Sequence, residues 1–189
     1  MIEVEIRGRL TDSEYDALNS FLQKEGVYLG REEREMFLLY DYPGYNEDPT
    51  TRDVDIRLRS TNGNCEIMVK HKAHGRNVGR KEVSLKLKDS NLDNAKAIVK
   101  ALGFKKAIKM NRTKELFKYN GIEWSLVKLP KQLSYFEAEK ESDAEDALNE
   151  IQEELTTQAQ KLNLKVLGPD ETKEFISVLD EKLNTEVEL

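Results

Sequence analysis

Two pairs of acidic residues carry the clearest chemistry in this sequence. Glu3 and Glu5 lie in EVEIR, and Glu137 and Glu139 lie in YFEAE. Because side chains alternate along a strand, each E-x-E pair places both carboxylates on one face. Carboxylate oxygens are the ligands that hard divalent cations prefer in proteins. The two pairs therefore indicate a face of a sheet that can hold metal ions.

Basic side chains follow the same alternation on the strands between the two acidic pairs. IRLR places Arg57 and Arg59 on one face, and CEIMVKHK places Lys70 and Lys72 together with an acid. Guanidinium and ammonium groups bind phosphate oxygens. If the sheet closes with its charged faces inward, these bases can neutralise a polyanion while the acids hold its metal ions.

An antiparallel sheet with one face in water would give the same alternation without any function. The sorting of the charges favours a site, because the acids pair on the first and last strands and the bases dominate the middle ones. A purely structural face remains the simplest alternative.

Capping residues and apolar spacing predict the helices. A helix follows the capping box of Thr11 and Glu14, and a second covers residues 90–103. A third is predicted to start near Ser142, and Pro169 opens a short last one. Strands are predicted over residues 2–9, 27–43, 53–60, 65–72 and 80–88, with two or three more between residues 107 and 141.

Length and composition limit the possible classes of protein. The chain of 189 residues predicts a single domain over residues 1–189, with a helical tail over about 168–189. A net charge of −6 argues against general binding to nucleic acid or to an anionic membrane. One cysteine and two histidines do not make a structural zinc cluster. The first residues lack the apolar core of a signal peptide, so a cytoplasmic location is expected.

Five segments in order resemble a known family. EVEIR resembles the E-x-E-x-K signature of the CYTH family, named for CyaB adenylyl cyclases and thiamine triphosphatases and also called triphosphate tunnel metalloenzymes. IRLR, EIMVK, RKE and YFEAE follow in the expected order, and the resemblance covers roughly residues 1–180. It implies an α+β fold, a closed eight-stranded antiparallel β-barrel with a charged lumen and helices packed outside. It also implies Mg²⁺ or Mn²⁺ and a substrate that carries a triphosphate.

The resemblance also implies roles for individual residues. The implied metal ligands are Glu3, Glu5, Glu137 and Glu139. The implied triphosphate-binding residues are Arg7, Arg57, Arg59, Lys70, Lys72, Arg80, Arg112 and Lys114. The implied catalytic residues are Glu5, Arg7 and Glu82. Arg7 replaces the usual lysine, and because arginine keeps its charge, it suits phosphate clamping rather than proton transfer.

The sequence departs from the family pattern at four further positions. Val127 stands where a metal-binding aspartate is usual, and Leu133 where a glycine is usual. Ser84 replaces a second acid, and Met110 falls at a position that is usually basic. Fewer hard oxygen ligands would weaken metal binding or change the number of bound ions.

The expected function is that of a metal-dependent phosphohydrolase that removes the terminal phosphate of a triphosphate. The substrate would be tripolyphosphate, a nucleoside triphosphate or thiamine triphosphate, and the sequence does not choose among them. One alternative is a class IV adenylyl cyclase that makes cyclic AMP from ATP, and another is a catalytically weakened module that binds polyanions. No nucleic-acid or membrane partner is expected, and the protein would be a monomer or a homodimer.

Overall fold

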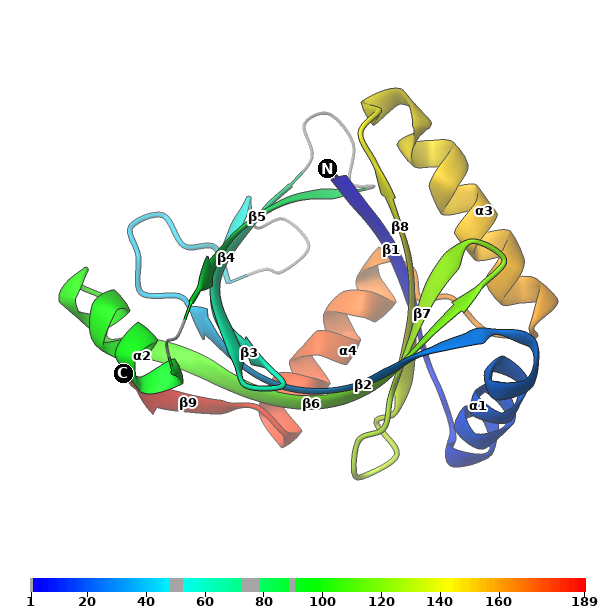
Figure 1. Cartoon of the computed structure of the whole chain (residues 1–189), viewed down its shortest axis with the longest axis horizontal. Coiled ribbons are helices and arrows are strands. Elements are labelled where there is room, and N and C mark those ends of the chain that lie inside the picture. The colour runs from blue at the N-terminus through cyan, green and yellow to red at the C-terminus, as the bar shows by residue number, and fades with distance from the viewer. Residues whose placement is uncertain (1, 48–52, 73–78, 89–90) are drawn as a thin grey trace. The chain divides into compact units, whose positions relative to one another are not determined.

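The computed structural model describes residues 2–47, 53–72, 79–88 and 91–189 (Figure 1). The strands are β1 Ile2–Arg9, β2 Val27–Leu39, β3 Val54–Thr61, β4 Asn64–Lys72, β5 Arg80–Leu87, β6 Lys106–Tyr119, β7 Ile122–Val127, β8 Tyr135–Ser142 and β9 Thr185–Glu188. The helices are α1 Asp12–Glu25, α2 Leu92–Ala101, the 3-10 helix η1 Glu145–Ala147, α3 Leu148–Lys161 and α4 Pro169–Lys182. None of these helices is both long enough and apolar enough to cross a membrane.

The strands are hydrogen-bonded in a closed order. The order is β2-β3-β4-β5-β1-β8-β7-β6-β9, and β2 also pairs with β6, so the first eight strands form a ring. The pairs whose register is described, among them β1–β8, β3–β4 and β7–β8, are antiparallel. The predicted fold class, a closed eight-stranded antiparallel β-barrel with helices, is therefore confirmed.

The chain divides into two compact units. Unit 1 consists of Met1–Glu32, Ala73–Arg80 and Arg112–Thr172, and unit 2 consists of Glu33–Lys72, Lys81–Asn111 and Lys173–Leu189. Each unit has its own hydrophobic core. The assignment of residues 1–189 to a single domain stays a prediction.

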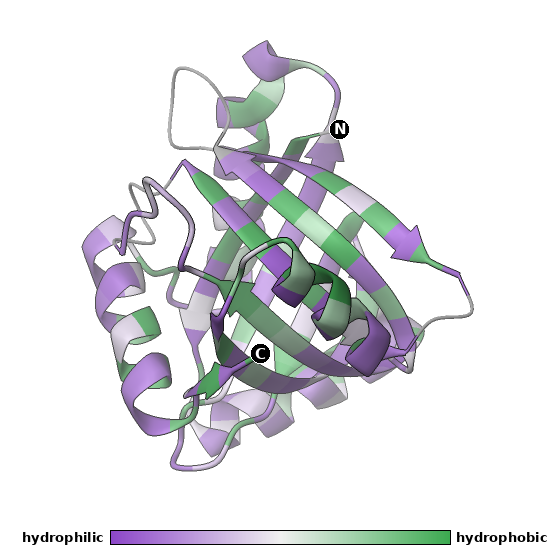
Figure 2. Ribbon diagram, turned by 90° about the vertical axis from the view of Figure 1, so that its left-hand side faces the viewer, coloured by the Kyte–Doolittle hydropathy of each residue, from purple (hydrophilic) through white to green (hydrophobic). Residues whose placement is uncertain are grey.

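The core of unit 1 lies between its strands and helices α1 and α3. In β1 the buried residues Ile2, Val4 and Ile6 alternate with the half-buried charged ones, as the period of two predicts. The same alternation colours several strands in Figure 2. Because α1 and α3 supply Leu22 and Leu155 to this apolar face, the charged residues of β1 lie on the opposite face of the sheet.

The capping box predicted for the first helix is present, whereas the predicted start of the third helix is wrong. Thr11 Oγ1 accepts from the backbone N–H of Glu14 at 3.3 Å, and Glu14 Oε2 accepts from that of Thr11 at 2.7 Å. Ser142 instead ends β8, and its hydroxyl forms a local turn with the backbone of Ala144. Helix α3 therefore begins at Leu148, after η1, without a side-chain cap.

The core of unit 2 lies between β2, β3 and helix α2. Phe37, Leu39 and Leu58 pack with Ala95 and Val99 of the helix. The Asn91 side chain caps α2 by accepting from the backbone N–H of Asn94 at 2.9 Å.

The last helix, which Pro169 was predicted to open, is present, but the final residues of the predicted helical tail form a strand. Helix α4 stops at Lys182, and Thr185–Glu188 form strand β9, which pairs antiparallel with the first residues of β6. Val187 and Leu189 pack against the core of unit 2. A strand of four residues lies at the lower limit of the length over which alternation is recognised in a sequence.

Candidate active site

Three carboxylates from two adjacent strands meet in unit 1. Antiparallel pairing of β1 with β8 sets Glu5 opposite Glu139, so both side chains lie on the charged face. Glu3 lies two residues before Glu5 on that face. One carboxylate oxygen of each of Glu3, Glu5 and Glu139 lies within 4.8 Å of the other two. These three residues are the acidic trio.

Within the acidic trio, burial and the neighbouring carboxylates act most strongly on Glu139. Burial raises the pKa of Glu139, and the negative charges of Glu3, Glu5 and Glu137 raise it further, to about 8, although Lys114 opposes this shift. The trio therefore binds a proton where most carboxylates are ionised. Half-buried oxygen ligands with excess negative charge fit a hard divalent cation.

Replacing Glu139 with glutamine is expected to stabilise the metal-free protein at alkaline pH. Because the folded chain raises the pKa of this carboxyl from 4.5 to about 8, its contribution to stability is fully present below pH 4.5. That contribution is lost as the pH rises through the folded pKa. We expect Glu139→Gln to exceed the wild type by about 2 kcal/mol at about pH 9 and to match it at about pH 4.

Urea unfolding in a chelating buffer at both pH values measures this difference. Glu141→Gln is the matched control, because Glu141 lies two residues further along the same strand and is exposed. An equal gain in the control, or a gain at acidic pH alone, would contradict the raised pKa of Glu139.

A chain of ion pairs runs from the acidic trio along the same face. Arg7 Nε donates to Glu5 Oε1 at 3.0 Å, and an Arg7 NH2 group lies 3.5 Å from Glu137 Oε1. Lys114 Nζ donates to Glu137 Oε2, and both side chains are buried. Burial alone would lower the pKa of Arg7, but Glu5 and Glu137 outweigh it and raise that pKa, so the guanidinium stays charged.

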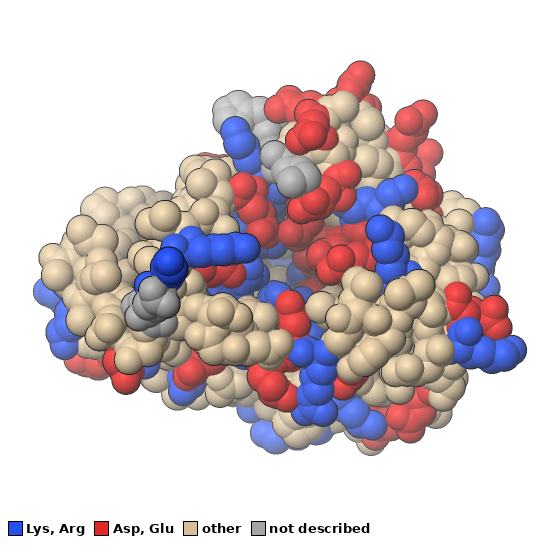
Figure 3. Space-filling view, in the orientation of Figure 1, with Lys and Arg blue, Asp and Glu red and all other residues tan. Residues whose placement is uncertain are grey.

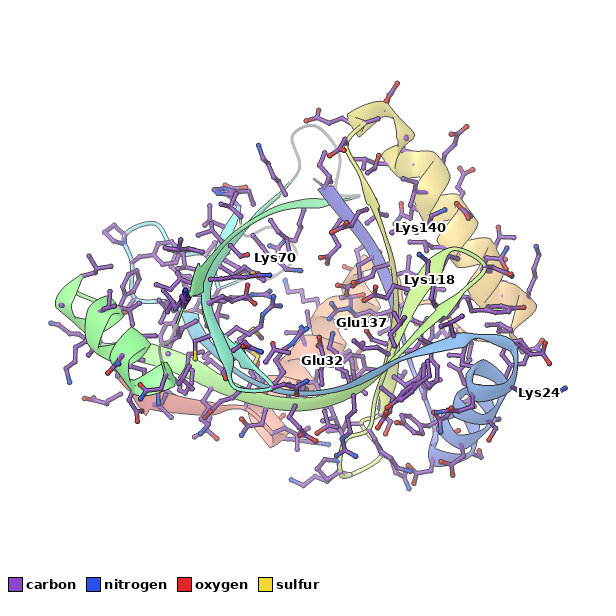
Figure 4. All side chains as sticks on the ribbon, in the orientation of Figure 1. Lys24, Glu32, Lys70, Lys118, Glu137 and Lys140 are labelled. Carbon is purple, nitrogen blue, oxygen red and sulfur yellow. The ribbon has the colours of Figure 1, made fainter. Side chains whose placement is uncertain are left out.

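The two faces of β8 carry different pairs. The side chains of Glu137 and Lys140 point to opposite sides of this strand (Figure 4). Lys140 Nζ donates to Glu154 of α3 at 2.8 Å, on the helix side. Glu137, in contrast, forms an ion pair with Lys114 and is not one of the three carboxylates of the acidic trio. Its role as a metal ligand stays a prediction.

The structure adds two residues to this face that the sequence analysis did not select. Glu123 lies directly opposite Glu139 in the β7–β8 ladder, and burial followed by the charge of Glu32 raises its pKa. Tyr135 is buried, and burial followed by the charge of Glu137 raises the pKa of its phenol. Alternation in IEWSLV and YFEAE could have identified both, because each lies two or four residues from a predicted position.

One face of unit 2 carries three of the basic residues predicted on β3 and β4, Arg57, Arg59 and Lys70, and carboxylates accompany them. An Arg57 NH2 group donates to Asp55 Oδ2 at 2.8 Å, and Arg59 Nε donates to Glu66 Oε1 at 2.6 Å. The three bases and their acidic partners form the base face of unit 2, which consists of Arg57, Arg59, Lys70, Asp55, Glu66 and Glu82. Lys70 forms an ion pair with Glu82. Burial lowers the pKa of Arg59, as does the charge of Arg34, while Glu66 raises it.

Other predicted residues lie elsewhere on the strands. Lys72 ends β4, and its side chain lies outside the described part of the structure. Arg80 begins β5 in unit 1 and is half-buried. Arg112 lies on β6 in unit 1, where its charge opposes the rise in the pKa of Tyr135. Which of these residues bind phosphate stays a prediction.

The departures from the family pattern have structural counterparts. Val127 is fully buried and lies opposite Lys114 on one side and Tyr135 on the other. It therefore provides an apolar contact where an oxygen ligand was expected. Ser84 is exposed on β5.

Charges of both signs are interspersed on the molecular surface. Figure 3 shows acidic and basic side chains mixed over the face in view rather than a continuous basic area. This mixture agrees with the net charge of −6.

A sequence model of the CYTH domain matches residues 1–170 of this chain. No curated protein matches it. Among solved structures, the PH1819 protein from Pyrococcus horikoshii OT3 is 20% identical over 95% of this chain and 99% of its own, with a TM-score of 0.74. A candidate adenylate cyclase from Vibrio parahaemolyticus is also 20% identical, over 94% and 98% of the two chains, with a TM-score of 0.69.

A more distant structure is that of the Hippeastrum protein HpAC1, a candidate adenylyl cyclase with a dominant triphosphatase activity. It is 12% identical over 87% of this chain and 89% of its own, with a TM-score of 0.52. At these identities the three structures show a shared fold.

Proposed function

Because this chain belongs to the CYTH domain family, we propose that it is a divalent-metal-dependent triphosphatase. Enzymes of this family bind triphosphate substrates and in general depend on a metal ion. The reaction proposed here is hydrolysis of the terminal phosphate of an inorganic or organic triphosphate.

The acidic trio next to Arg7 is the observation that carries this proposal. Its three carboxylates would hold Mg²⁺ or Mn²⁺, and Arg7 lies at hydrogen-bonding distance from one of them. When bound, the ion would polarise the phosphoryl group and help position the attacking water. Negative charge spreads over a phosphoryl group while it is transferred. A metal ion and cationic side chains close to that group stabilise this charge.

The chain's own cations would clamp the phosphate oxygens. Arg7 presents a charged fork of donors, and Lys114 provides a buried point charge beside Glu137. Glu5 and Glu137 would hold Arg7 in orientation, as their short contacts with it indicate. Further phosphate contacts are proposed for Arg57, Arg59, Lys70, Lys72, Arg80 and Arg112, and a supporting acidic role is proposed for Glu82.

An adenylyl cyclase is the second candidate, since the similar Vibrio protein is a candidate enzyme of that kind. Both reactions would use the same triphosphate site. The products of ATP separate them: ADP and phosphate indicate hydrolysis, whereas cyclic AMP and pyrophosphate indicate cyclisation.

Phosphate release by the purified protein tests the proposal. Tripolyphosphate, ATP and thiamine triphosphate are each incubated with Mg²⁺, with Mn²⁺ and with a chelator alone. We expect release from at least one substrate with metal and none with the chelator. Intact substrates under every condition would reject the hydrolase, and tight binding without turnover would support a module that only binds polyanions.

A further inference from the structure

Carboxylates compensate the charge of the base face. Arg57, Arg59 and Lys70 each form an ion pair with an acid of the same unit, as described above. All three side chains of the bases are at most 20% exposed, so water screens these pairs less than it screens surface pairs. A polyanion that contacts these bases would therefore also lie close to negative charge.

Asp55 is the most deeply placed of these acids. It is 3% exposed, and it accepts a hydrogen bond from Arg57 at 2.8 Å. The antiparallel β3–β4 register sets it directly opposite Lys70. Its side chain thus bonds to one proposed phosphate-binding cation, and Asp55 lies opposite a second one on the neighbouring strand.

An ionised carboxylate at this position repels the oxygens of a free triphosphate. At 4 Å, two unit charges interact by about 4 kcal/mol in the partly screened surroundings typical of a protein. A divalent cation carried on the phosphate chain removes two negative charges, so the same carboxylate repels the metal complex much less. The difference between the binding free energies of these two forms of the ligand is the specificity of the site.

We propose that Asp55 is a specificity-determining residue that makes the base face select a triphosphate as its magnesium complex over the metal-free polyanion. This inference rests on the proposed function, because it assumes that the base face binds the triphosphate. It deepens that function by defining the form of the substrate. Asp55 acts through the charge that it places beside Arg57 and opposite Lys70, and it takes no part in the chemical step.

Binding of a tripolyphosphate analogue with imido bridges, which resists hydrolysis, tests the inference by calorimetry. The full chain and its Asp55→Asn variant are titrated once in chelator and once in excess Mg²⁺. We expect Asp55→Asn to bind the metal-free analogue about tenfold more tightly than the wild type. In Mg²⁺ the gain should be about twofold or less.

Asp53→Asn is the matched control, because Asp53 is exposed two residues earlier and the substitution changes the net charge equally. Its affinity should equal that of the wild type in both buffers. Glu66→Gln, which removes the partner of Arg59, should repeat the gain in chelator. If Asp55→Asn does not fold, as judged by thermal unfolding, the same titrations of Asp55→Ser, which also removes the charge, decide the outcome.

Equal or weaker binding of the metal-free analogue by these variants would overturn the inference, and so would an equal gain in both buffers. The result does not depend on turnover. Phosphate release without any selective gain would reject Asp55 as a determinant and leave the triphosphatase intact. A selective gain without phosphate release would support Asp55 and reject the hydrolase.

Discussion

A variant carrying both Glu3→Gln and Glu5→Gln is expected to hydrolyse its substrate about 10³-fold more slowly than the wild type. Two of the three carboxylates of the acidic trio would be replaced by neutral amides, while the volumes of the side chains would hardly change. Weaker metal binding should move the metal dependence of phosphate release to higher concentration. Initial rates over a series of Mg²⁺ and Mn²⁺ concentrations measure both effects.

Glu150→Gln with Glu153→Gln is the control for this double variant. Both residues are exposed on α3, and their replacement changes the net charge by the same amount. Partial recovery of the rate at high metal concentration would indicate that the variant has lost metal ligands. A displaced Arg7 would instead lower the rate at every metal concentration. Wild-type rates in the Glu3 and Glu5 variant would show that the acidic trio is not the metal site.

Strand alternation predicts the face of a side chain well, and this accounts for most of the agreement between sequence and structure. It placed Glu3 and Glu5 on the charged face of β1, opposite Val4 and Ile6, as observed. Alternation alone does not say which strands become neighbours. The contact of Glu5 with Glu139 requires β1 to pair with β8. The resemblance to a known family supplied only the expectation that both acidic pairs hold metal ions.

Local rules also missed residues that they could have found. Asp55 shares its parity with Arg57, and Glu123 shares its parity with Val127, so alternation places both on charged faces. Their significance lies in partners across the ladder, Lys70 and Glu139, which single-strand patterns do not identify. The ion pairs of the base face likewise depend on register, and register is set by contacts between strands.

Helix and strand ends followed competing local interactions. Ser142 has the residue type of a helix cap, but β8 continues to it and its hydroxyl closes a turn instead. Strand β9 forms because the start of β6 offers it hydrogen-bonding partners, and its isolated propensity is small. Both differences show tertiary contacts overriding a local preference.

Gly8→Ala is expected to destabilise the fold by about 3 kcal/mol or more. A Cβ atom at position 8 would lie 2.1 Å from the carbonyl oxygen of Lys165 and 2.4 Å from the Phe136 ring. The chain passes this close because Leu167 donates its backbone N–H to the carbonyl of Arg7 at 2.9 Å. Backbone and a buried ring cannot move aside as a flexible side chain would, so β1 itself must shift.

A shift of β1 would also displace the metal ligands that lie on it. We therefore expect Gly8→Ala to raise the metal concentration needed for activity, in addition to lowering the urea midpoint. Gly168→Ala is the control, since its nearest contact would be 3.8 Å, to Glu171, and its stability should change by about 0.5 kcal/mol or less. Equal stability of the two variants would show that the segment around Lys165 does not lie against β1 as described.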